Sequence, residues 1–214
     1  FNTIKEKGFL VEETQSMPFS ESQQRYLSDR FVEGTCPHCD FESARGDQCD
    51  NCGRTLDAED LIDIRSKRDG SQLIFKDTTH QMFTLGSFQE QLEEWVASRT
   101  DWRQNVRNQT LGMLREGLRS RAMTRDIDWG VTVPLEGYEN KRFYVWFEAV
   151  MGYLSATKAW AENQGTPDEW KKFWVDPDGE TYYFQGKDNV PFHTIIWPAI
   201  LMGYGGLNLP TDVV

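Results

Sequence analysis

The sequence predicts a mixed α/β fold that carries a small, separate segment built around cysteines. Residues 181–202 predict the α/β part, because a β-rich run, a short loop with a glycine and an apolar helical run follow one another there. All four cysteines of the 214-residue chain lie between positions 36 and 52. That stretch is too short and too rich in turns to form a core of its own. The length predicts one large domain or two small ones.

The composition predicts a folded chain with a substantial core. Hydrophobic residues make up 38% and aromatic residues 13%, including 8 Trp and 13 Phe, which excludes wholesale disorder. The longest apolar run, residues 195–203, is interrupted by Pro198 and is shorter than the roughly 20 residues that cross a bilayer, so no membrane partner is expected. The first residues show no secretory signal, and a cytoplasmic location is expected.

The chain is acidic. Its 34 Asp and Glu residues against 23 Lys and Arg residues give a formal net charge of −11, which repels phosphate backbones at long range. Bulk electrostatics therefore exclude a protein whose main task is to hold nucleic acid. A local basic patch stays open as an alternative.

Strands are expected to be short. Residues 1–30 show only brief helical and turn signals, whereas the apolar runs 73–75 and 82–85 predict two short strands. The aromatic run 143–147 predicts a strand that is buried on both faces. Residues 181–185 predict a further strand after a turn of the Asp-Pro-Asp-Gly type.

Helices are expected between these strands. Ser87 is followed three residues later by Glu90, which predicts a capping box at a helix start. Apolar residues recur at helical spacing after it and again over residues 102–118. Residues 149–163 predict another helix, and the last helix is expected to run to about Met202.

The cysteines form two C-x₂-C pairs, Cys36 with Cys39 and Cys49 with Cys52, and nine residues separate the pairs. Two such turns can direct four thiolates at one ion, and a tetrahedral S₄ site is typical of zinc. An iron–sulfur cluster is the competing metal interpretation. A redox pair fits two adjacent motifs poorly, and disulfides are disfavoured without a secretory signal. The zinc is expected to be structural, because four protein ligands leave no open position. His38 could replace one cysteine, but with four cysteines present it is expected to face solvent.

Four segments resemble the class I methionyl-tRNA synthetases. Residues 29–39 (DRFVEGTCPHC) are similar to that family's entry into its zinc knuckle, and residues 124–130 (TRDIDWG) to the segment that leads back into its catalytic sheet. Residues 144–153 (YVWFEAVMGY) and 186–199 (GKDNVPFHTIIWPA) resemble its two methionine-pocket motifs. The four segments occur in the family's order over nearly the whole chain.

The resemblance implies the second half of a Rossmann-type parallel-sheet catalytic domain with an inserted zinc-knuckle connective-peptide domain. It implies that residues 1–120 form the insertion, with the knuckle at about 31–56, and that residues 121–214 form the catalytic half. Nothing in the sequence resembles the family's HIGH or KMSKS signatures. An internal fragment is therefore expected, which is inactive when isolated.

The two pocket motifs carry the residues that the resemblance assigns to methionine. A thioether favours aromatic surface with few strong hydrogen bonds, and these side chains supply it. His193 and Trp197 are four residues apart, which places them on one face of a helix. Aromatic residues in such a pattern could instead belong to the hydrophobic core and bind no ligand. The resemblance assigns to the methionine pocket Trp146, Ala149, Tyr153, Asn189, Phe192, His193 and Trp197.

The resemblance places Gly186, Lys187 and Asp188 on the ATP side, with Arg125 and Asp188 as the catalytic candidates. Residues 186–188 lie at the carboxyl end of a predicted strand, which suits a ligand site in an open α/β sheet. Asp188 could instead cap a helix, and Arg125 could instead pair with Asp126 or Asp128. The partners implied are methionine, ATP with Mg²⁺ and tRNA(Met).

Two other functions stay open from the sequence. One is a class I synthetase for another apolar amino acid, which shares the fold but not the string at 186–199. The other is a stand-alone zinc-ribbon interaction module that binds no substrate. The oligomeric state is not indicated by the sequence.

Overall fold

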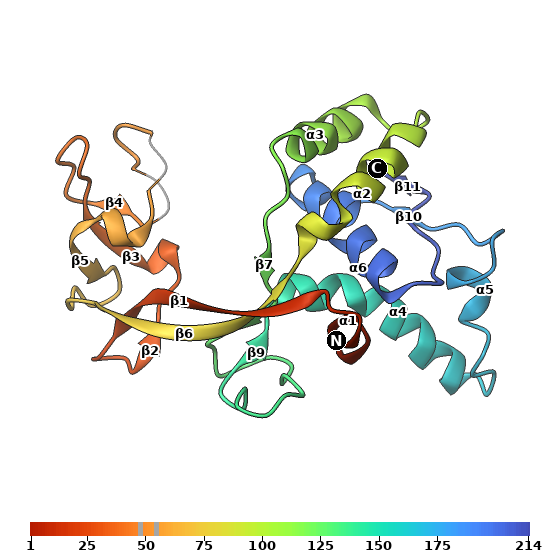
Figure 1. Cartoon of the computed structure of the whole chain (residues 1–214), viewed down its shortest axis with the longest axis horizontal. Coiled ribbons are helices and arrows are strands. Elements are labelled where there is room, and N and C mark those ends of the chain that lie inside the picture. The colour runs from red at the N-terminus through yellow and green to blue at the C-terminus, as the bar shows by residue number, and fades with distance from the viewer. Residues whose placement is uncertain (47–48, 54–55) are drawn as a thin grey trace.

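The computed structural model describes residues 1–46, 49–53 and 56–214. A small lobe of short strands and a larger lobe of helices lie at the two ends of an elongated molecule (Figure 1). We call the small one the cysteine lobe, residues 21–73, and the large one the helical lobe, residues 1–9 and 84–214. A long hairpin of β1 (Leu10–Ser20) and β6 (Ile74–Phe83) joins them.

The hairpin is antiparallel from Leu10 opposite Phe83 to Phe19 opposite Ile74. The short strands β2 (Arg25–Tyr26) and β7 (Arg121–Ala122) extend it to a sheet in the order β2-β1-β6-β7. The expectation of short elements was wrong here: residues 1–30 contain an eleven-residue strand, and the runs 73–75 and 82–85 belong to one strand or border it. The middle of both strands is polar, exposed in β1 and partly buried in β6, so hydrophobic alternation could not reveal them.

The cysteine lobe has its own small core. The elements of this lobe are η1 (Asp29–Phe31), β3 (Val32–Thr35), β4 (Ala44–Arg45), η2 (Ala58–Asp60) and β5 (Ile62–Ser66). Its three strands form an antiparallel sheet in the order β4-β3-β5, with a register shift in the β3–β5 pairing. The buried residues of the lobe, among them Val32 and two of the cysteines, form one cluster that is separate from the core of the helical lobe.

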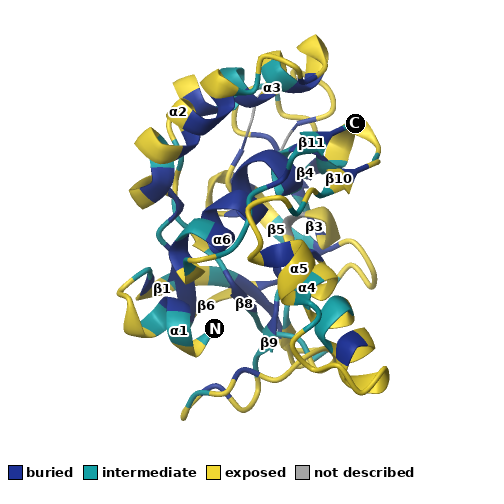
Figure 2. Cartoon of the chain, turned by 90° about the vertical axis from the view of Figure 1, so that its right-hand side faces the viewer, coloured by how far each residue is buried: buried dark blue, intermediate teal, exposed yellow. Residues whose placement is uncertain are grey.

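The helical lobe is built around α6 (Trp197–Tyr204), which is buried at its centre (Figure 2). The π-helical turn η5 (Phe192–Ile196) leads directly into α6 and is buried with it. The other elements of the lobe are α1 (Asn2–Glu6), η3 (Leu85–Phe88), α2 (Gln89–Ser98), α3 (Gln104–Arg115), β8 (Thr124–Arg125), β9 (Arg142–Phe143), α4 (Val145–Asn163), α5 (Lys171–Trp174), β10 (Tyr182–Tyr183), η4 (Lys187–Asn189) and β11 (Asp212–Val213).

Two expected element boundaries were wrong. Only Phe143 of the aromatic run 143–147 lies in a strand, because α4 starts at Val145, and the N–H groups of Phe147 and Glu148 donate to the carbonyl of Tyr144. A short apolar run fits a buried strand and a buried helix equally well, and the helix forms here. The capping box is also absent: Ser87 lies inside η3, and α2 begins at Gln89.

The predicted mixed α/β class is confirmed. The parallel pairing lies between β10 and β11, at the edge of the helical lobe. The buried residues of α2 and α3 pack in the same core as α4 and α6, whereas the division into 1–120 and 121–214 stays a prediction. No helix in the described part of the chain is long and apolar enough to cross a membrane.

Candidate substrate pocket and metal centre

The four cysteines of the cysteine lobe converge on one point. Their Sγ atoms all lie within 4.8 Å of one another, and none of the four is in a disulfide. The Sγ atoms of Cys36 and Cys52 are 3.9 Å apart, and those of Cys39 and Cys49 are 3.6 Å apart. A tetrahedral ion with four bonds of about 2.3 Å to sulfur requires sulfur–sulfur distances of about 3.8 Å. The cluster therefore fits one tetrahedral metal ion.

The two C-x₂-C turns share one backbone geometry. In the first, the N–H of Asp40 donates to the carbonyl of Cys36 at 3.0 Å, and Asp40 has a φ of 57°. In the second, the N–H of Gly53 donates to the carbonyl of Cys49 at 2.8 Å, and Gly53 has a φ of 72°. Asp and Gly both tolerate this left-handed conformation better than most residues. The repeated turn directs both cysteine pairs inward.

Hydrogen bonds to sulfur stabilise thiolates at this cluster. The N–H of His38 donates to Cys36 Sγ at 3.4 Å, and Asn51 Nδ2 donates to Cys39 Sγ at 3.5 Å. The bond from Asn51, followed by one from the backbone at Phe41, lowers the pKa of Cys39 to about 6. Because a thiolate is the form that binds a metal, these contacts support ligand chemistry.

Three aromatic side chains meet where α4, β10 and η5 come together. Tyr153 Oη lies 2.8 Å from His193 Nε2. The rings of Tyr153, Tyr183 and His193 lie 5.2 to 5.7 Å apart, measured between centroids. Trp197 Nε1 donates to Tyr183 Oη at 2.9 Å. The π-helical turn places His193 and Trp197 against the same residue, Tyr183.

The contacts of His193 define its tautomer. Its Nδ1 lies 2.9 Å from the carbonyl of Asn189, which can only accept, so Nδ1 carries the proton. Nε2 therefore accepts the hydroxyl proton of Tyr153. Burial lowers the pKa of His193 and outweighs the opposing effect of the Asn189 carbonyl, so the ring is neutral at pH 7.

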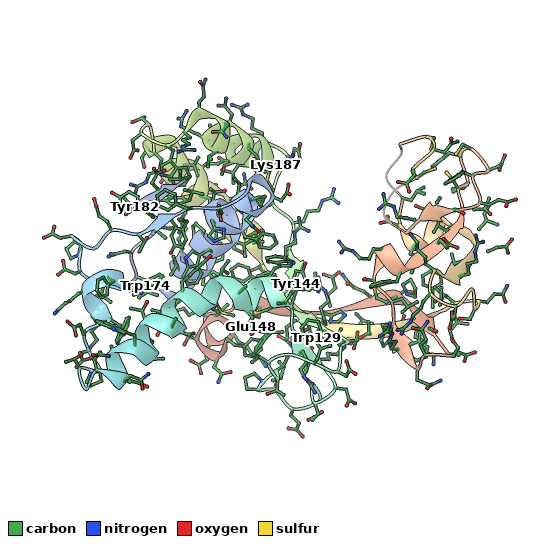
Figure 3. The ribbon with its side chains drawn as sticks, turned by 180° about the vertical axis from the view of Figure 1, so that it is seen from behind. Trp129, Tyr144, Glu148, Trp174, Tyr182 and Lys187 are labelled. Carbon is green, nitrogen blue, oxygen red and sulfur yellow. The ribbon has the colours of Figure 1, made fainter. Side chains whose placement is uncertain are left out.

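A cavity of about 380 Å³ opens beside this aromatic cluster. Two of the predicted pocket residues, Tyr153 and His193, line it. Tyr182 and Trp174, labelled in Figure 3, also belong to its wall. The remaining lining residues are neutral as well: Ala156, Thr157, Thr181, Tyr183, Phe184 and Gln185. The cavity thus offers rings, hydroxyls and one amide to a ligand, but no charge.

The other predicted pocket residues lie on α4, η4, η5 and α6 without lining the cavity. Trp146 and Phe192 pack against each other with ring centroids 5.4 Å apart, and Trp146 is 44% exposed. Ala149 lies on the exposed side of α4 one turn after Trp146, whereas Asn189 ends η4. Trp197 is fully buried.

The residues predicted for the ATP side lie in two separate places. Gly186, Lys187 and Asp188 are exposed, and Gly186 caps η4, so Asp188 is not its N-cap. Arg125 donates to the carbonyls of Ala122 and Thr124, both at 2.9 Å, and its guanidinium lies 4.4 Å from the ring centre of Tyr144. Figure 3 shows Tyr144 at the start of α4 and Lys187 on a separate segment.

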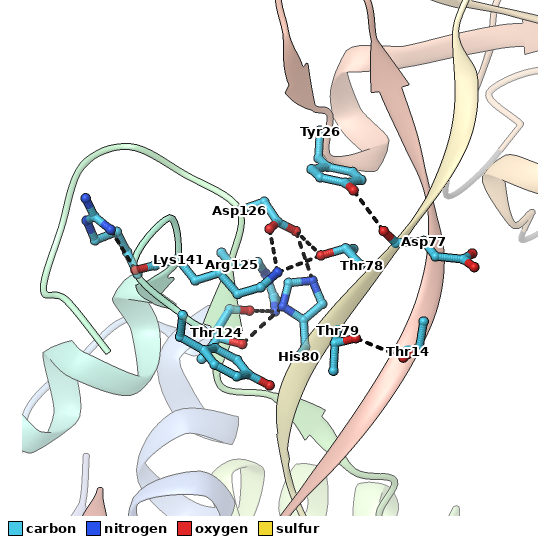
Figure 4. A network of polar contacts seen from close by, with 12 residues as sticks. Thr14, Tyr26, Asp77, Thr78, Thr79, His80, Thr124, Arg125, Asp126 and Lys141 are labelled. Atoms are coloured by element: carbon cyan, nitrogen blue, oxygen red, sulfur yellow. Dashed lines mark hydrogen bonds and ion pairs between the residues drawn. The ribbon is translucent and has the colours of Figure 1, made fainter. Parts of the chain in front are cut away.

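A polar network connects the hairpin to the segment that follows β8. Asp126 Oδ1 lies 2.5 Å from Lys141 Nζ, and its Oδ2 accepts from Thr78 Oγ1 at 2.8 Å (Figure 4). His80 Nε2 lies 3.3 Å from the same carboxylate, and His80 Nδ1 lies 3.1 Å from Thr124 Oγ1. Both His80 and Lys141 are largely buried. The carboxylate of Asp126 therefore holds three side chains at one point.

Sequence reasoning missed two of these features. Tyr183 contacts three predicted pocket residues, Tyr153, His193 and Trp197, but the sequence pattern places it only in an expected strand. Asp126 was considered only as a surface partner of Arg125, because its real partners lie 48 residues upstream and 15 downstream. A buried strand residue before a glycine-bearing loop was a usable signal for Tyr183. No local signal pointed to the Asp126 network.

Comparisons with known proteins agree over the whole chain. A family model described as tRNA synthetases class I (M) matches residues 1–214. The chain is 57% identical over 213 residues to a protein of Dehalococcoides mccartyi named methionine--tRNA ligase, and the match covers 100% of the chain and 38% of that protein. A protein of the same name from Thermoplasma acidophilum is 48% identical over 213 residues, covering 100% of the chain and 39% of the relative.

The fold has a counterpart among solved structures. Mycobacterium tuberculosis methionyl-tRNA synthetase bound by methionyl-adenylate aligns with a TM-score of 0.61 over 99% of this chain and 36% of that one, at 19% identity. That likeness concerns the fold. With the family model and the close relatives, it identifies the class: the chain belongs to the class I tRNA synthetases (M). The chain spans about two fifths of the length of the relatives that it matches.

Proposed function

We propose that the chain is part of a methionine–tRNA ligase, which activates methionine with ATP and transfers it to tRNA(Met). The observation that carries this proposal is the 57% identity over the whole chain to the D. mccartyi protein of that name. The match over residues 1–214 disfavours a stand-alone zinc-ribbon module. The uncharged, aromatic cavity favours an apolar substrate side chain.

Methionine is proposed to bind with its side chain against the rings of Tyr153, Tyr183 and His193. A thioether gains from contact with ring edges and requires no strong hydrogen bond. Because Tyr153 donates to His193 and Trp197 donates to Tyr183, the hydroxyl oxygens of both tyrosines and the Nε2 atom of His193 already have partners. A charged substrate side chain would lose its hydration without gaining an opposite charge. The proposed pocket further includes Trp146, Ala149, Asn189, Phe192 and Trp197.

On the ATP side, Gly186, Lys187 and Asp188 are proposed to contact the nucleotide. The reaction joins the methionine carboxylate to AMP as pyrophosphate leaves, so it depends on positioning and on stabilising phosphate charge. Lys187 and Arg125 supply positive charge, and Asp188 supplies an acceptor for a ribose hydroxyl or for the substrate ammonium group. An added Cβ at Gly186 would meet no atom within 4 Å, so its backbone is open to a ligand.

The cysteine cluster is proposed to hold one structural Zn²⁺. Four sulfur ligands at tetrahedral spacing close the coordination sphere, so Cys36, Cys39, Cys49 and Cys52 would fold the lobe around the ion. An iron–sulfur cluster uses the same ligands, and the absorption spectrum of the purified protein separates the two. Visible bands of iron–thiolate charge transfer would contradict the zinc assignment.

Methionine binding provides the test of the proposed pocket. Titrating methionine into the protein should change its tryptophan fluorescence in a saturable way, because Trp174 lines the cavity and Trp197 contacts Tyr183. Leucine and isoleucine should cause no such change. A His193→Ala variant should lose the methionine response, whereas the matched Lys158→Ala variant outside the cavity should keep it. An equal response to leucine would favour a synthetase for another apolar amino acid.

The isolated 214 residues are still expected to form no methionyl-adenylate, as the missing HIGH and KMSKS signatures predict. Methionine-dependent exchange of pyrophosphate into ATP by this chain alone would contradict that expectation. A cytoplasmic location belongs to the same proposal, since charged tRNA is consumed in translation.

A further inference from the structure

One histidine of the long hairpin contacts both chain neighbours of Arg125, and we propose that His80 is a positioning residue for that arginine. His80 Nδ1 lies 3.1 Å from Thr124 Oγ1, and His80 Nε2 lies 3.3 Å from Asp126 Oδ2 (Figure 4). Thr124 precedes Arg125 in the chain, and Asp126 follows it. A single ring therefore holds the chain on either side of the residue that is proposed to stabilise phosphate charge.

The guanidinium of Arg125 is held by its own stretch of backbone. It donates to the carbonyls of Ala122 and Thr124, both at 2.9 Å. It also lies 4.4 Å from the ring centre of Tyr144, and the N–H of Tyr144 donates to the carbonyl of Met123 at 2.8 Å. The position of the guanidinium therefore follows the position of this stretch.

The backbone connection between the hairpin and this stretch stops just before Arg125. β7 pairs with β6, and the N–H of Met123 donates to the carbonyl of Gln81 at 2.8 Å. β8 belongs to a different sheet and pairs with β9. From Thr124 onward the hairpin is reached through side chains: the Thr124 hydroxyl accepts from the N–H of Gln81 at 3.1 Å, and it also faces His80.

His80 is suited to hold protein groups and not a substrate. It is 3% exposed, and Thr124 is fully buried. Because a carboxylate only accepts, the neutral ring carries its proton on Nε2 toward Asp126, and the Thr124 hydroxyl can donate to Nδ1. Both ring nitrogens thus have protein partners. Lys141 and Thr78 hold Asp126 as well, whereas the ring of His80 holds Asp126 and Thr124 together.

The inference rests on the proposed function, because it gives Arg125 its role on the ATP side. His80 would act on the reaction only through Arg125. Since His80 belongs to β6, the strand that leads to the cysteine lobe, the same ring links the position of that lobe to the position of the arginine.

A spectroscopic test uses the 214-residue chain. The Nε–Hε NMR signal of Arg125, identified by its loss in Arg125→Ala, should carry a ring-current shift from Tyr144. His80→Phe keeps a ring but removes both polar contacts, so the signal should move toward that of an exposed arginine. Gln81→Met is the matched control: it changes the next buried residue of the strand, removes the bond to Tyr138 Oη and should leave the signal in place.

A kinetic test uses the intact ligase to which the chain is proposed to belong. In methionine-dependent pyrophosphate exchange, His80→Phe should lower kcat about 10- to 100-fold, because a misplaced guanidinium stabilises phosphate charge poorly. The KM for methionine should stay unchanged. In an Arg125→Ala background, His80→Phe should cause no further loss, because its effect passes through the missing side chain. Gln81→Met should leave kcat unchanged in both backgrounds.

Two results would overturn the proposal: a folded His80→Phe variant with the wild-type Arg125 signal, or the same loss of kcat with and without Arg125. Thr124→Val removes one of the two contacts and is the milder variant if His80→Phe does not fold; an unshifted signal and an unchanged kcat in Thr124→Val would overturn the proposal too. A wild-type ligase without methionine-dependent exchange would contradict the proposed function, whereas the NMR test still decides whether His80 fixes Arg125.

Discussion

His80 Nε2 lies 3.3 Å from Asp126 Oδ2, so a residue of the long hairpin is joined to the segment that follows β8. Lys141 approaches the other oxygen of the same carboxylate. The neighbouring Gln81 adds a second link, because its Nε2 donates to Tyr138 Oη at 2.9 Å. The hairpin is thus fixed to the helical lobe by polar contacts at its base.

Replacing Asp126 with asparagine should destabilise the protein by about 3 kcal/mol, because it leaves the largely buried Lys141 ammonium without its opposite charge. Urea unfolding measures this difference. The matched change Asp168→Asn breaks the exposed pair with Lys171, in which Asp168 is 81% exposed, and should cost less than about 1 kcal/mol. Equal effects of the two changes would contradict the importance of the network.

The carboxylate of Asp126 should make the stability of the folded protein depend on pH. Burial by itself would raise the pKa of Asp126, but hydrogen bonds from His80, Lys141 and Thr78 outweigh it and lower the pKa to about 2. The unfolded chain titrates near 3.9, so about 2 to 3 kcal/mol of stability is present above pH 4 and is lost as the pH falls toward 2. Urea unfolding across that range should show this loss in the wild type and a smaller one in Asp126→Asn.

Removing one cysteine should unfold the cysteine lobe and leave the aromatic cluster intact. Cys49→Ser deprives the tetrahedral site of a buried ligand, and the lobe has only a small core to replace it. Metal analysis should show loss of the ion, and methionine-induced fluorescence should persist. His38→Ala is the matched control and should retain the metal. Normal metal content and melting temperature in Cys49→Ser would refute the structural role.

His193 should make the pocket sensitive to mild acid. Burial lowers the pKa of His193 in the folded state below the value of about 6.5 that it has when unfolded. Its contribution to stability is therefore complete above about pH 6.5 and decreases as the pH falls. Methionine affinity should fall with it, because a protonated ring cannot accept from Tyr153. In His193→Gln this part of the pH dependence should disappear from both measurements.

Two glycine substitutions should have opposite effects. A Cβ at Gly34 would lie 2.8 Å from the carbonyl oxygen of Ile62 on the neighbouring strand, so Gly34→Ala should cost about 1–3 kcal/mol. Gly112 lies within α3, where an added Cβ meets no atom within 4 Å, and Gly112→Ala should stabilise by about 0.5–1 kcal/mol. Thermal melting measures both, and destabilisation by Gly112→Ala would contradict the open space.

Local sequence patterns were sufficient where the structure depends on neighbours in sequence. The spacing of Cys36, Cys39, Cys49 and Cys52 predicted one cluster, because each C-x₂-C turn closes on itself. Helical spacing likewise predicted the stretch that became α3. The class and the family are confirmed, whereas the roles of the individual site residues stay predictions.

Local sequence patterns failed where contacts between residues far apart in the sequence determine the structure. In the run 143–147, Phe143 ends β9 and Tyr144 is the N-cap of α4. The contacts made here are with residues distant in sequence: the N–H of Tyr144 donates to the carbonyl of Met123, and the ring of Phe147 packs against Phe83. The hairpin has no apolar alternation in its middle, because the residues that β6 buries there, Thr78, His80 and Gln81, are polar. The pairing of Asp126 with His80 is tertiary, so no window of sequence contains both residues.

The hairpin is attached at one end and carries a separate lobe at the other. Its ten paired residues span about 34 Å at about 3.4 Å each. It is clamped at the helical lobe by Asp126 and Gln81 and bears the cysteine lobe at its free end (Figure 1). From His80 to Ile74 the strand is six residues or about 20 Å long, so a rotation of about 5° at the clamp displaces the far end by about 2 Å. A small rotation at His80 would therefore shift the position of the whole cysteine lobe.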